Sequence, residues 1–121
     1  MAHILIVDDS PTERHFFTSI LEKNGHTVSI ATDGEEGIDK AKELNPDLIL
    51  MDVVMPGMNG FQATRRLNQN TATKKIPIVI VSTKDQETDK VWAKRQGAIE
   101  YLTKPTQEKP LMNCVNQLLS A

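Results

Sequence analysis

Short apolar runs alternate with segments of helical period along the whole chain. Five runs have the length and the flanking turn residues of strands. We place them at His3–Val7, Thr27–Ala31, Leu48–Met51, Pro77–Val81 and Ile99–Leu102. The segments between and after them repeat their apolar residues every three or four positions, which is typical of amphipathic helices. Five strands alternating with five helices predict an α/β fold, with a parallel sheet covered on both faces.

The composition of the strands predicts their order in the sheet. Residues 4–7, 48–51 and 78–81 are almost entirely apolar, as expected for central strands of a parallel sheet. Residues 27–31 alternate and residues 99–103 are mixed, so these two strands are expected at the edges. The order 2-1-3-4-5 satisfies this pattern, and it defines the flavodoxin-like doubly wound (βα)5 fold. The length of 121 residues predicts one domain that spans residues 1–121.

Capping signals mark the ends of the helices. Ser10-Pro11-Thr12-Glu13 has the form of a capping box with proline at the first helical position, and Gly25 ends that helix. For the fourth helix we expect either Thr83 with Gln86, or Asp85 alone, at the N-cap. Trp92, the only tryptophan, lies on this helix, and we expect it to pack against the core.

Charge and composition narrow the class of protein. The formal net charge is −2, which argues against a nucleic-acid-binding surface. The one cysteine, Cys114, has no partner within the chain, which fits a reducing compartment. No apolar run has the length of a membrane span and no signal peptide is visible. We therefore expect a cytoplasmic protein without membrane insertion.

Three carboxylates and one lysine follow strand ends. Asp8 and Asp9 come after the first strand, Asp52 after the third, and Lys104 after the last. In a sheet of this order, ligands bind beyond the carboxyl ends of the strands, where the order reverses between strands 1 and 3. Carboxylates brought together repel one another and need a cation or a raised pKa. The set therefore favours a hard metal ion together with a phosphate-like group.

Each of these residues has an ordinary interpretation when taken alone. An aspartate pair before Ser10 can end a strand and cap a helix, and Asp52 can be a turn residue. Lys104 before proline can be a plain loop lysine. Ser82 and Thr83, at the end of the fourth strand, border the same crevice. The convergence of residues from four strand ends on one place makes a functional site the better interpretation.

Four motifs together carry a specific resemblance over the whole chain. They are ILIVDDS at 4–10, DLILMDVVMPGMNG at 47–60, IVIVST at 78–83 and GAIEYLTKP at 97–105. On these motifs the chain resembles the receiver domain of bacterial two-component response regulators. Residues 83–92 and 95–97 also resemble the stand-alone receivers of type IV pilus twitching-motility chemosensory systems.

The resemblance implies roles for the matching residues around the metal. Asp52 is the expected phosphoacceptor, and Mg²⁺ is the expected cofactor. Asp9 and Asp52 are implied as direct ligands, Asp8 as a ligand through water, and Val54 as a ligand through its backbone carbonyl. Carboxylate and carbonyl oxygens with retained waters suit this ion.

Further roles are implied for the residues at the ends of strands 4 and 5. Ser82 is expected to contact the phosphoryl group and Lys104 to pair with it. Ser82, Thr83 and Tyr101 are the expected switch residues, with Tyr101 filling the space that Ser82 leaves when it moves inward. The Lys104–Pro105 bond is cis in the family, and a cis bond is plausible chiefly before proline.

The implied function is that of a single-domain regulator without an output domain. A histidine kinase is the expected phosphodonor, and the fourth helix, fifth strand and fifth helix form the expected face for a protein target. That face includes Lys90, Lys94, Tyr101 and parts of 109–116. We expect a monomer that is not a turnover enzyme and performs only Mg²⁺-dependent self-phosphorylation and autodephosphorylation.

Other interpretations remain open at this point. The protein could instead be a phosphate sink, a phosphorelay intermediate or a phosphorylation-independent interaction module. An aspartate-dependent phosphohydrolase is disfavoured, because such enzymes typically need a second acid two positions after the nucleophile. In this chain Val54 occupies that position. The chain has no glycine-rich phosphate-binding loop after its first strand, which argues against a nucleotide-binding domain. Val54 and Lys84 leave the lifetime of an acyl phosphate open.

Overall fold

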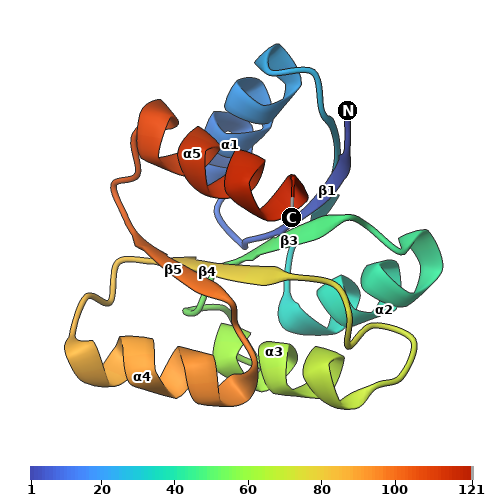
Figure 1. The fold of residues 1–121 in the computed structure, drawn as a ribbon. Coiled ribbons are helices and arrows are strands. Elements are labelled where there is room, and N and C mark those ends of the chain that lie inside the picture. The colour runs from blue at the N-terminus through green and yellow to red at the C-terminus, as the bar shows by residue number, and fades with distance from the viewer. Residues whose placement is uncertain (121) are drawn as a thin grey trace.

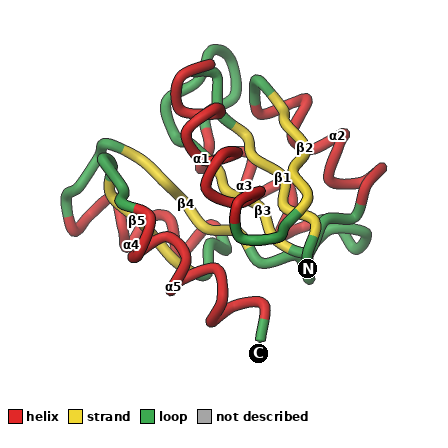
Figure 2. The backbone as a smooth tube through the Cα atoms, turned by 90° about the horizontal axis from the view of Figure 1, so that it is seen from above, coloured by secondary structure: helices red, strands yellow, loops and turns green. Residues whose placement is uncertain are grey.

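Five parallel strands form one sheet in the order β2-β1-β3-β4-β5, which confirms the predicted fold class. The computed structural model describes residues 1–120. Its strands are β1 His3–Val7, β2 Thr27–Ala31, β3 Leu48–Met51, β4 Ile78–Ser82 and β5 Glu100–Thr103. Its helices are α1 Pro11–Lys23, α2 Gly34–Leu44, α3 Gly60–Gln69, α4 Glu87–Gln96 and α5 Glu108–Leu119. Figure 2 shows the strands side by side, from β2 at one edge to β5 at the other.

The helices cover both faces of the sheet. In Figure 1, α1 and α5 lie on one face and α2, α3 and α4 on the other. The first face packs Phe17, Leu21, Leu111 and Val115 against one set of alternate strand residues. The opposite set, such as Leu5 and Ile49, packs against α2, α3 and α4. Because both faces are buried, the central strands are apolar at nearly every position.

Two strands begin one residue later than the sequence predicts. The predicted strands at Pro77–Val81 and Ile99–Leu102 are found at Ile78–Ser82 and Glu100–Thr103. The pairing of β4 with β5 runs from Val79 and Glu100 to Ser82 and Thr103, so both strands also end one residue later than predicted. Polar residues that look like loop in the sequence are thus held in the sheet, at the end where the candidate site lies.

The capping box predicted for α1 forms only in half. Ser10 Oγ accepts a hydrogen bond from Glu13 N at 3.3 Å, as an N-cap should. The predicted second bond, from the Ser10 amide to the Glu13 carboxylate, does not form, because Ser10 N donates instead to Asp8 Oδ1 at 2.9 Å. A side chain from the strand end thus replaces Glu13 as the acceptor for this amide.

The N-cap predicted for α4 is wrong as well. The helix begins at Glu87 with Gln86 as its N-cap, and neither Thr83 nor Asp85 takes that position. The backbone N–H of Gln86 donates to Asp89 Oδ2 at 3.3 Å. Residues 83–86 therefore form a non-helical connection between β4 and α4, beside the candidate site.

Contrary to the expectation from the sequence, Trp92 does not pack into the core. It is 48% exposed on α4, and its neighbour Val91 is 46% exposed. The buried residues of this helix are Ala93 and Gln96, so the helix contacts the sheet through a narrow strip. Among the helices of residues 1–120, none is long and apolar enough to cross a membrane.

Candidate functional site

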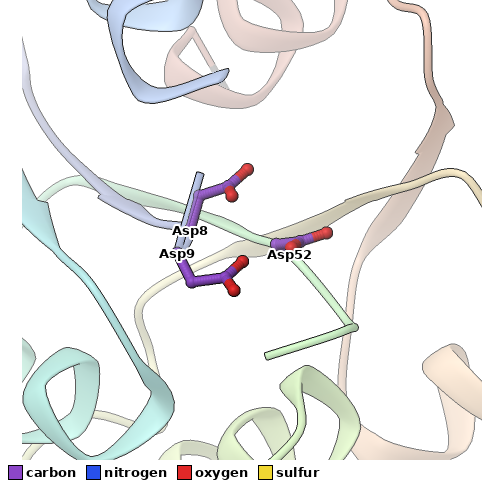
Figure 3. A group of neighbouring side chains, drawn as sticks. All are labelled: Asp8, Asp9 and Asp52. Carbon is purple, nitrogen blue, oxygen red and sulfur yellow. The ribbon is translucent and has the colours of Figure 1, made fainter. Parts of the chain in front are cut away.

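Three carboxylates meet at the carboxyl ends of β1 and β3. Val7 and Met51 are paired in the sheet, so Asp8 and Asp52, the residues that follow them, are brought side by side. One oxygen from each of Asp8, Asp9 and Asp52 lies within 4.8 Å of the other two. Figure 3 shows the three side chains gathered at this place. Asp8 is 2% exposed and Asp52 is 9% exposed, whereas Asp9 faces solvent.

The backbone at these positions is fixed by the sheet and by a close approach of α3. Asp8 N donates to Ala31 O at 3.1 Å, and Asp52 N donates to Val7 O at 2.9 Å. Gly60, the first residue of α3, donates its N–H to Val53 O at 2.9 Å. A Cβ atom at Gly60 would lie 1.9 Å from Asp52 O. Only glycine therefore allows α3 to begin so close to the acid at the end of β3.

Lys104 neutralises part of this negative charge. Its Nζ lies 3.0 Å from Asp8 Oδ2 and 3.4 Å from Asp52 Oδ1, and its side chain is 8% exposed. Its backbone N–H donates to Ser82 O at 2.8 Å, so the end of β4 holds the residue in place. One cation shared by two buried acids leaves the cluster short of positive charge.

Burial and the neighbouring charges shift the pKa values of both Asp52 and Lys104. Burial and the nearby charge of Asp8 raise the pKa of Asp52 to about 6, although Lys104 opposes the shift. Burial by itself lowers the pKa of Lys104, but the hydrogen bond to Asp8 and the charges of Asp52 and Asp8 outweigh it, so that the pKa is raised. A second positive charge at the site would favour the ionised form of Asp52.

The donor set fits a hard divalent cation. Its three carboxylates come from two adjacent strand ends, and Asp9 remains open to solvent. Oxygen ligands with room for water are what Mg²⁺ requires. The raised pKa of Asp52 indicates that a cation would relieve a real electrostatic cost.

A second group of predicted residues lies at the ends of β4 and β5. Ser82 is fully buried, and its Oγ accepts a hydrogen bond from Lys84 N at 3.2 Å. Tyr101, which is partly buried, donates its hydroxyl to Lys84 O at 2.6 Å. One peptide segment thus connects the serine with the tyrosine. A hydroxyl that accepts one hydrogen bond can still donate its own proton.

The remaining predicted residues lie around this centre. Val54 is 64% exposed in the loop after Asp52, and Thr83 is exposed just beyond β4. The bond between Lys104 and Pro105 is cis, as the resemblance implied.

Two residues of α1 belong to the site but were not singled out from the sequence. Glu13 Oε2 lies 4.0 Å from Lys104 Nζ, and Arg14 Nη1 donates to Asp8 O at 2.9 Å. The available signal was helical spacing: residues three and four positions after Ser10 lie on the same side of the helix as this N-cap.

Comparison with known proteins defines the class to which this fold and site belong. A family model described as the response regulator receiver domain matches residues 4–116. The chain therefore belongs to the receiver domain family of response regulators. Among individual proteins, it is 58% identical over 120 residues to Protein PilH of Pseudomonas aeruginosa, covering 99% of both chains. Protein PilG of the same organism is 32% identical over 112 residues, which are 93% of this chain and 83% of PilG.

Solved structures show the same fold. The chemotaxis protein CheY4 of Vibrio cholerae superposes with a TM-score of 0.92 at 33% identity, covering 98% of this chain and 99% of CheY4. The receiver domain of the sensor histidine kinase PA1611 from Pseudomonas aeruginosa gives a TM-score of 0.92 at 25% identity, covering 99% and 98% of the two chains. That structure contains a magnesium ion coordinated in its active site cleft.

Proposed function

We propose that this protein is a response regulator that accepts a phosphoryl group on Asp52 from a histidine kinase. The observation that carries the proposal is the buried Asp52 carboxylate, which shares the Lys104 ammonium with Asp8. Membership of the receiver domain family supports the same assignment. We further propose that it acts in the cytoplasm as a monomeric single domain and is not a turnover enzyme.

Mg²⁺ fits the site as the cofactor. Asp9 and Asp52 would bind it directly, Asp8 through water and Val54 through its backbone carbonyl. The acidic cluster and the magnesium ion in the PA1611 receiver domain support this set. The ion would supply positive charge for the transferred phosphoryl group, which this chemistry needs more than covalent assistance.

Three residues of the chain have separate roles in the proposed phosphoryl transfer. An ionised Asp52 oxygen forms a bond to phosphorus, while the bond from phosphorus to the histidine nitrogen of the donor breaks and that nitrogen keeps the electron pair. Lys104 is close enough to Asp52 to pair with a phosphoryl oxygen. The Ser82 hydroxyl donates a hydrogen bond to another oxygen. Water later releases phosphate and restores the Asp52 carboxylate.

The switch would run through Ser82 and Tyr101. Both contact Lys84, through its N–H and its carbonyl respectively, so a movement of Ser82 toward the phosphoryl group displaces the acceptor of Tyr101. Changing a two-state equilibrium from 1:99 to 99:1 needs about 5.5 kcal/mol, whereas one hydrogen bond contributes about 1 kcal/mol. Phosphorylation alone should therefore shift the equilibrium only in part, and a bound target should complete it.

This coupling has a direct spectroscopic test. Addition of a phosphoryl mimic such as beryllofluoride with Mg²⁺ should change the ring resonances and the relaxation dispersion of Tyr101. The same addition to Asp52→Asn should leave them unchanged. An unaffected ring in the wild-type protein, with the mimic demonstrably bound, would contradict the coupling.

The proposed target surface is the face formed by α4, β5 and α5. A hollow of about 210 Å³ lies on it, lined by Lys90, Lys94, Tyr101 and three neighbours. Tyr101 thus touches both the proposed switch and the proposed docking face. The similarity to Protein PilH and the twitching-motility resemblance support a target in type IV pilus chemosensory signalling.

Intact-mass measurement tests the phosphoacceptor. Incubation with acetyl phosphate and Mg²⁺ should add about 80 Da, the mass of one phosphoryl group, at a hydroxylamine-labile site. Asp52→Asn should abolish the addition, whereas Asp39→Asn on the exposed side of α2 should retain it. An interaction module that works without phosphorylation would gain no mass, and a phosphohydrolase would turn over phosphomonoesters steadily.

A further inference from the structure

Glu13 is left without its usual capping contact, and it faces the site instead. In a complete capping box the Glu13 carboxylate would accept from the Ser10 amide. That amide donates to Asp8 Oδ1 at 2.9 Å. Glu13 Oε2 lies 4.0 Å from Lys104 Nζ, with the glutamate side chain 36% exposed. The carboxylate therefore lies beside the lysine that Asp8 and Asp52 share, and it is partly open to solvent.

Glu13 is not needed to hold Lys104 in position. The ammonium has shorter contacts to Asp8 at 3.0 Å and Asp52 at 3.4 Å. The lysine backbone is bonded to Ser82 O at 2.8 Å. At 4.0 Å the contact with Glu13 is at the outer limit of an ion pair, so its main contribution is charge.

That charge changes the balance of the whole site. With Asp52 ionised, four carboxylates face two cations. The carboxylates are Asp8, Asp9, Glu13 and Asp52, and the cations are Lys104 and Arg14. In the metal-free site, removal of one carboxylate halves the excess of negative charge. With a divalent cation bound, the same removal changes the sum from zero to one positive charge. Partly exposed charges at short range still act through several ångströms of solvent at low ionic strength.

We infer that Glu13 selects ligands of the site by their charge, favouring a divalent cation and disfavouring free anionic phosphodonors. The inference rests on the proposed function and deepens it. With acetyl phosphate, the Asp52 carboxylate oxygen bonds to phosphorus, the bond to the acetate oxygen breaks, and acetate leaves with the electron pair. The donor approaches as an anion, so the Glu13 carboxylate opposes its approach. The same carboxylate attracts Mg²⁺.

The test compares two variants that lose the same charge from the same helix. Glu13→Gln removes the carboxylate at the site. Glu22→Gln removes an exposed carboxylate near the other end of α1 that has no ion pair among residues 1–120. For each variant, the rate of phosphorylation by acetyl phosphate is measured by intact mass at saturating Mg²⁺. The Mg²⁺ dissociation constant is measured separately by calorimetry.

The two readouts should change in opposite directions for Glu13→Gln. A unit charge roughly 8 Å from a dianion predicts phosphorylation about three- to tenfold faster at low salt. The gain should shrink to less than about twofold at roughly 0.5 M salt. Mg²⁺ should bind about two- to fivefold more weakly. Glu22→Gln should match the wild-type protein in both measurements.

Opposite changes cannot come from a general loss of structure, which would impair both properties. Unchanged rate and affinity in Glu13→Gln, or a parallel decrease of both, would overturn the inference. Equal effects of the two variants would also overturn it, because they would reflect net charge alone. If the wild-type protein gains no phosphoryl group at all, the proposed function fails, and the Mg²⁺ affinities still decide the role of Glu13.

Discussion

Lys104 and its two acidic partners show how single residues prepare this site. The ammonium is shared between Asp8 and Asp52, and Asp52 retains a pKa raised to about 6 by burial and by Asp8. In the folded protein without metal, ionised Asp52 is therefore held at a cost. A cation or a phosphoryl group that is paired with Lys104 changes that cost, which is how ligand binding can alter the energy of the fold.

Asp52→Asn should stabilise the metal-free protein at neutral pH. The folded-state pKa of Asp52 lies above the unfolded value of 3.8, so its ionisation lowers the free energy of unfolding as the pH rises through this interval. The variant lacks that loss and should be more stable by about 2–3 kcal/mol above about pH 6, and by almost nothing near pH 4. Urea unfolding in the presence of a chelator measures the difference.

The control for this prediction is Asp39→Asn, an exposed carboxylate on α2 without an ion pair in residues 1–120. Its stability relative to the wild-type protein should be nearly independent of pH. A stability gain in Asp52→Asn that is the same at both ends of the pH range would contradict a cost that arises from ionisation.

At the scale of elements, the beginning of α3 sets the geometry of the strand end. Gly60 brings the helix against the backbone of Asp52, where no side chain fits. Asn59 and Gln62 complete a capping box that fixes the direction of the helix. The position of the acid thus depends on the packing of a helix start as well as on the sheet.

Gly60→Ala should displace α3 from the strand end. The new methyl group would overlap Asp52 O, so we expect a loss of about 2–4 kcal/mol in the free energy of unfolding and much slower phosphorylation. Gly57→Ala is the matched control, because Gly57 has a φ of 72° but a methyl group added there would meet no atom within 4 Å. It should cost only about 1 kcal/mol and leave phosphorylation almost intact.

At the scale of the whole molecule, the site lies at the ends of strands that contribute to the hydrophobic clusters on both faces of the sheet. Asp8 and Asp52 extend strands whose alternate residues pack in opposite layers, and Lys104 reaches them from the far edge strand. A ligand at this point therefore contacts groups from β1, β3 and the chain after β5. Binding at this site should therefore raise the free energy of unfolding of the whole domain, because the ligand contacts elements that are distant in sequence.

Mg²⁺ should raise the thermal midpoint of the phosphate-free protein. At ten times its dissociation constant, a ligand specific to the folded state adds about 1.4 kcal/mol, which corresponds to roughly 4–8 °C for a domain of this size. Asp9→Asn should lose most of the shift with little change in the metal-free midpoint, because Asp9 is exposed. Calorimetry at matched ionic strength measures the shift, and an equal shift in both proteins would argue against the proposed ligands.

The sequence predicted the features that depend on pattern and topology. The strand order follows from which runs are apolar throughout, and that order places Asp8, Asp9 and Asp52 together. The sequence did not predict contacts for which two residues compete. Both Glu13 and Asp8 are close enough in sequence to accept from the Ser10 amide, and the pattern does not show that Asp8 is the one that does. The exposure of Trp92 was missed because α4 buries only a narrow strip, Ala93 and Gln96, and helical period alone does not give its width.

The link between Ser82 and Tyr101 passes through main-chain atoms of residue 84. Most substitutions of the Lys84 side chain should therefore leave that connection intact, so the surface beside it can change without disrupting the proposed switch. Proline is the exception, because it has no N–H to offer the serine. If the proposed switch uses this connection, it should tolerate substitutions at residue 84 that a connection through the lysine side chain would not.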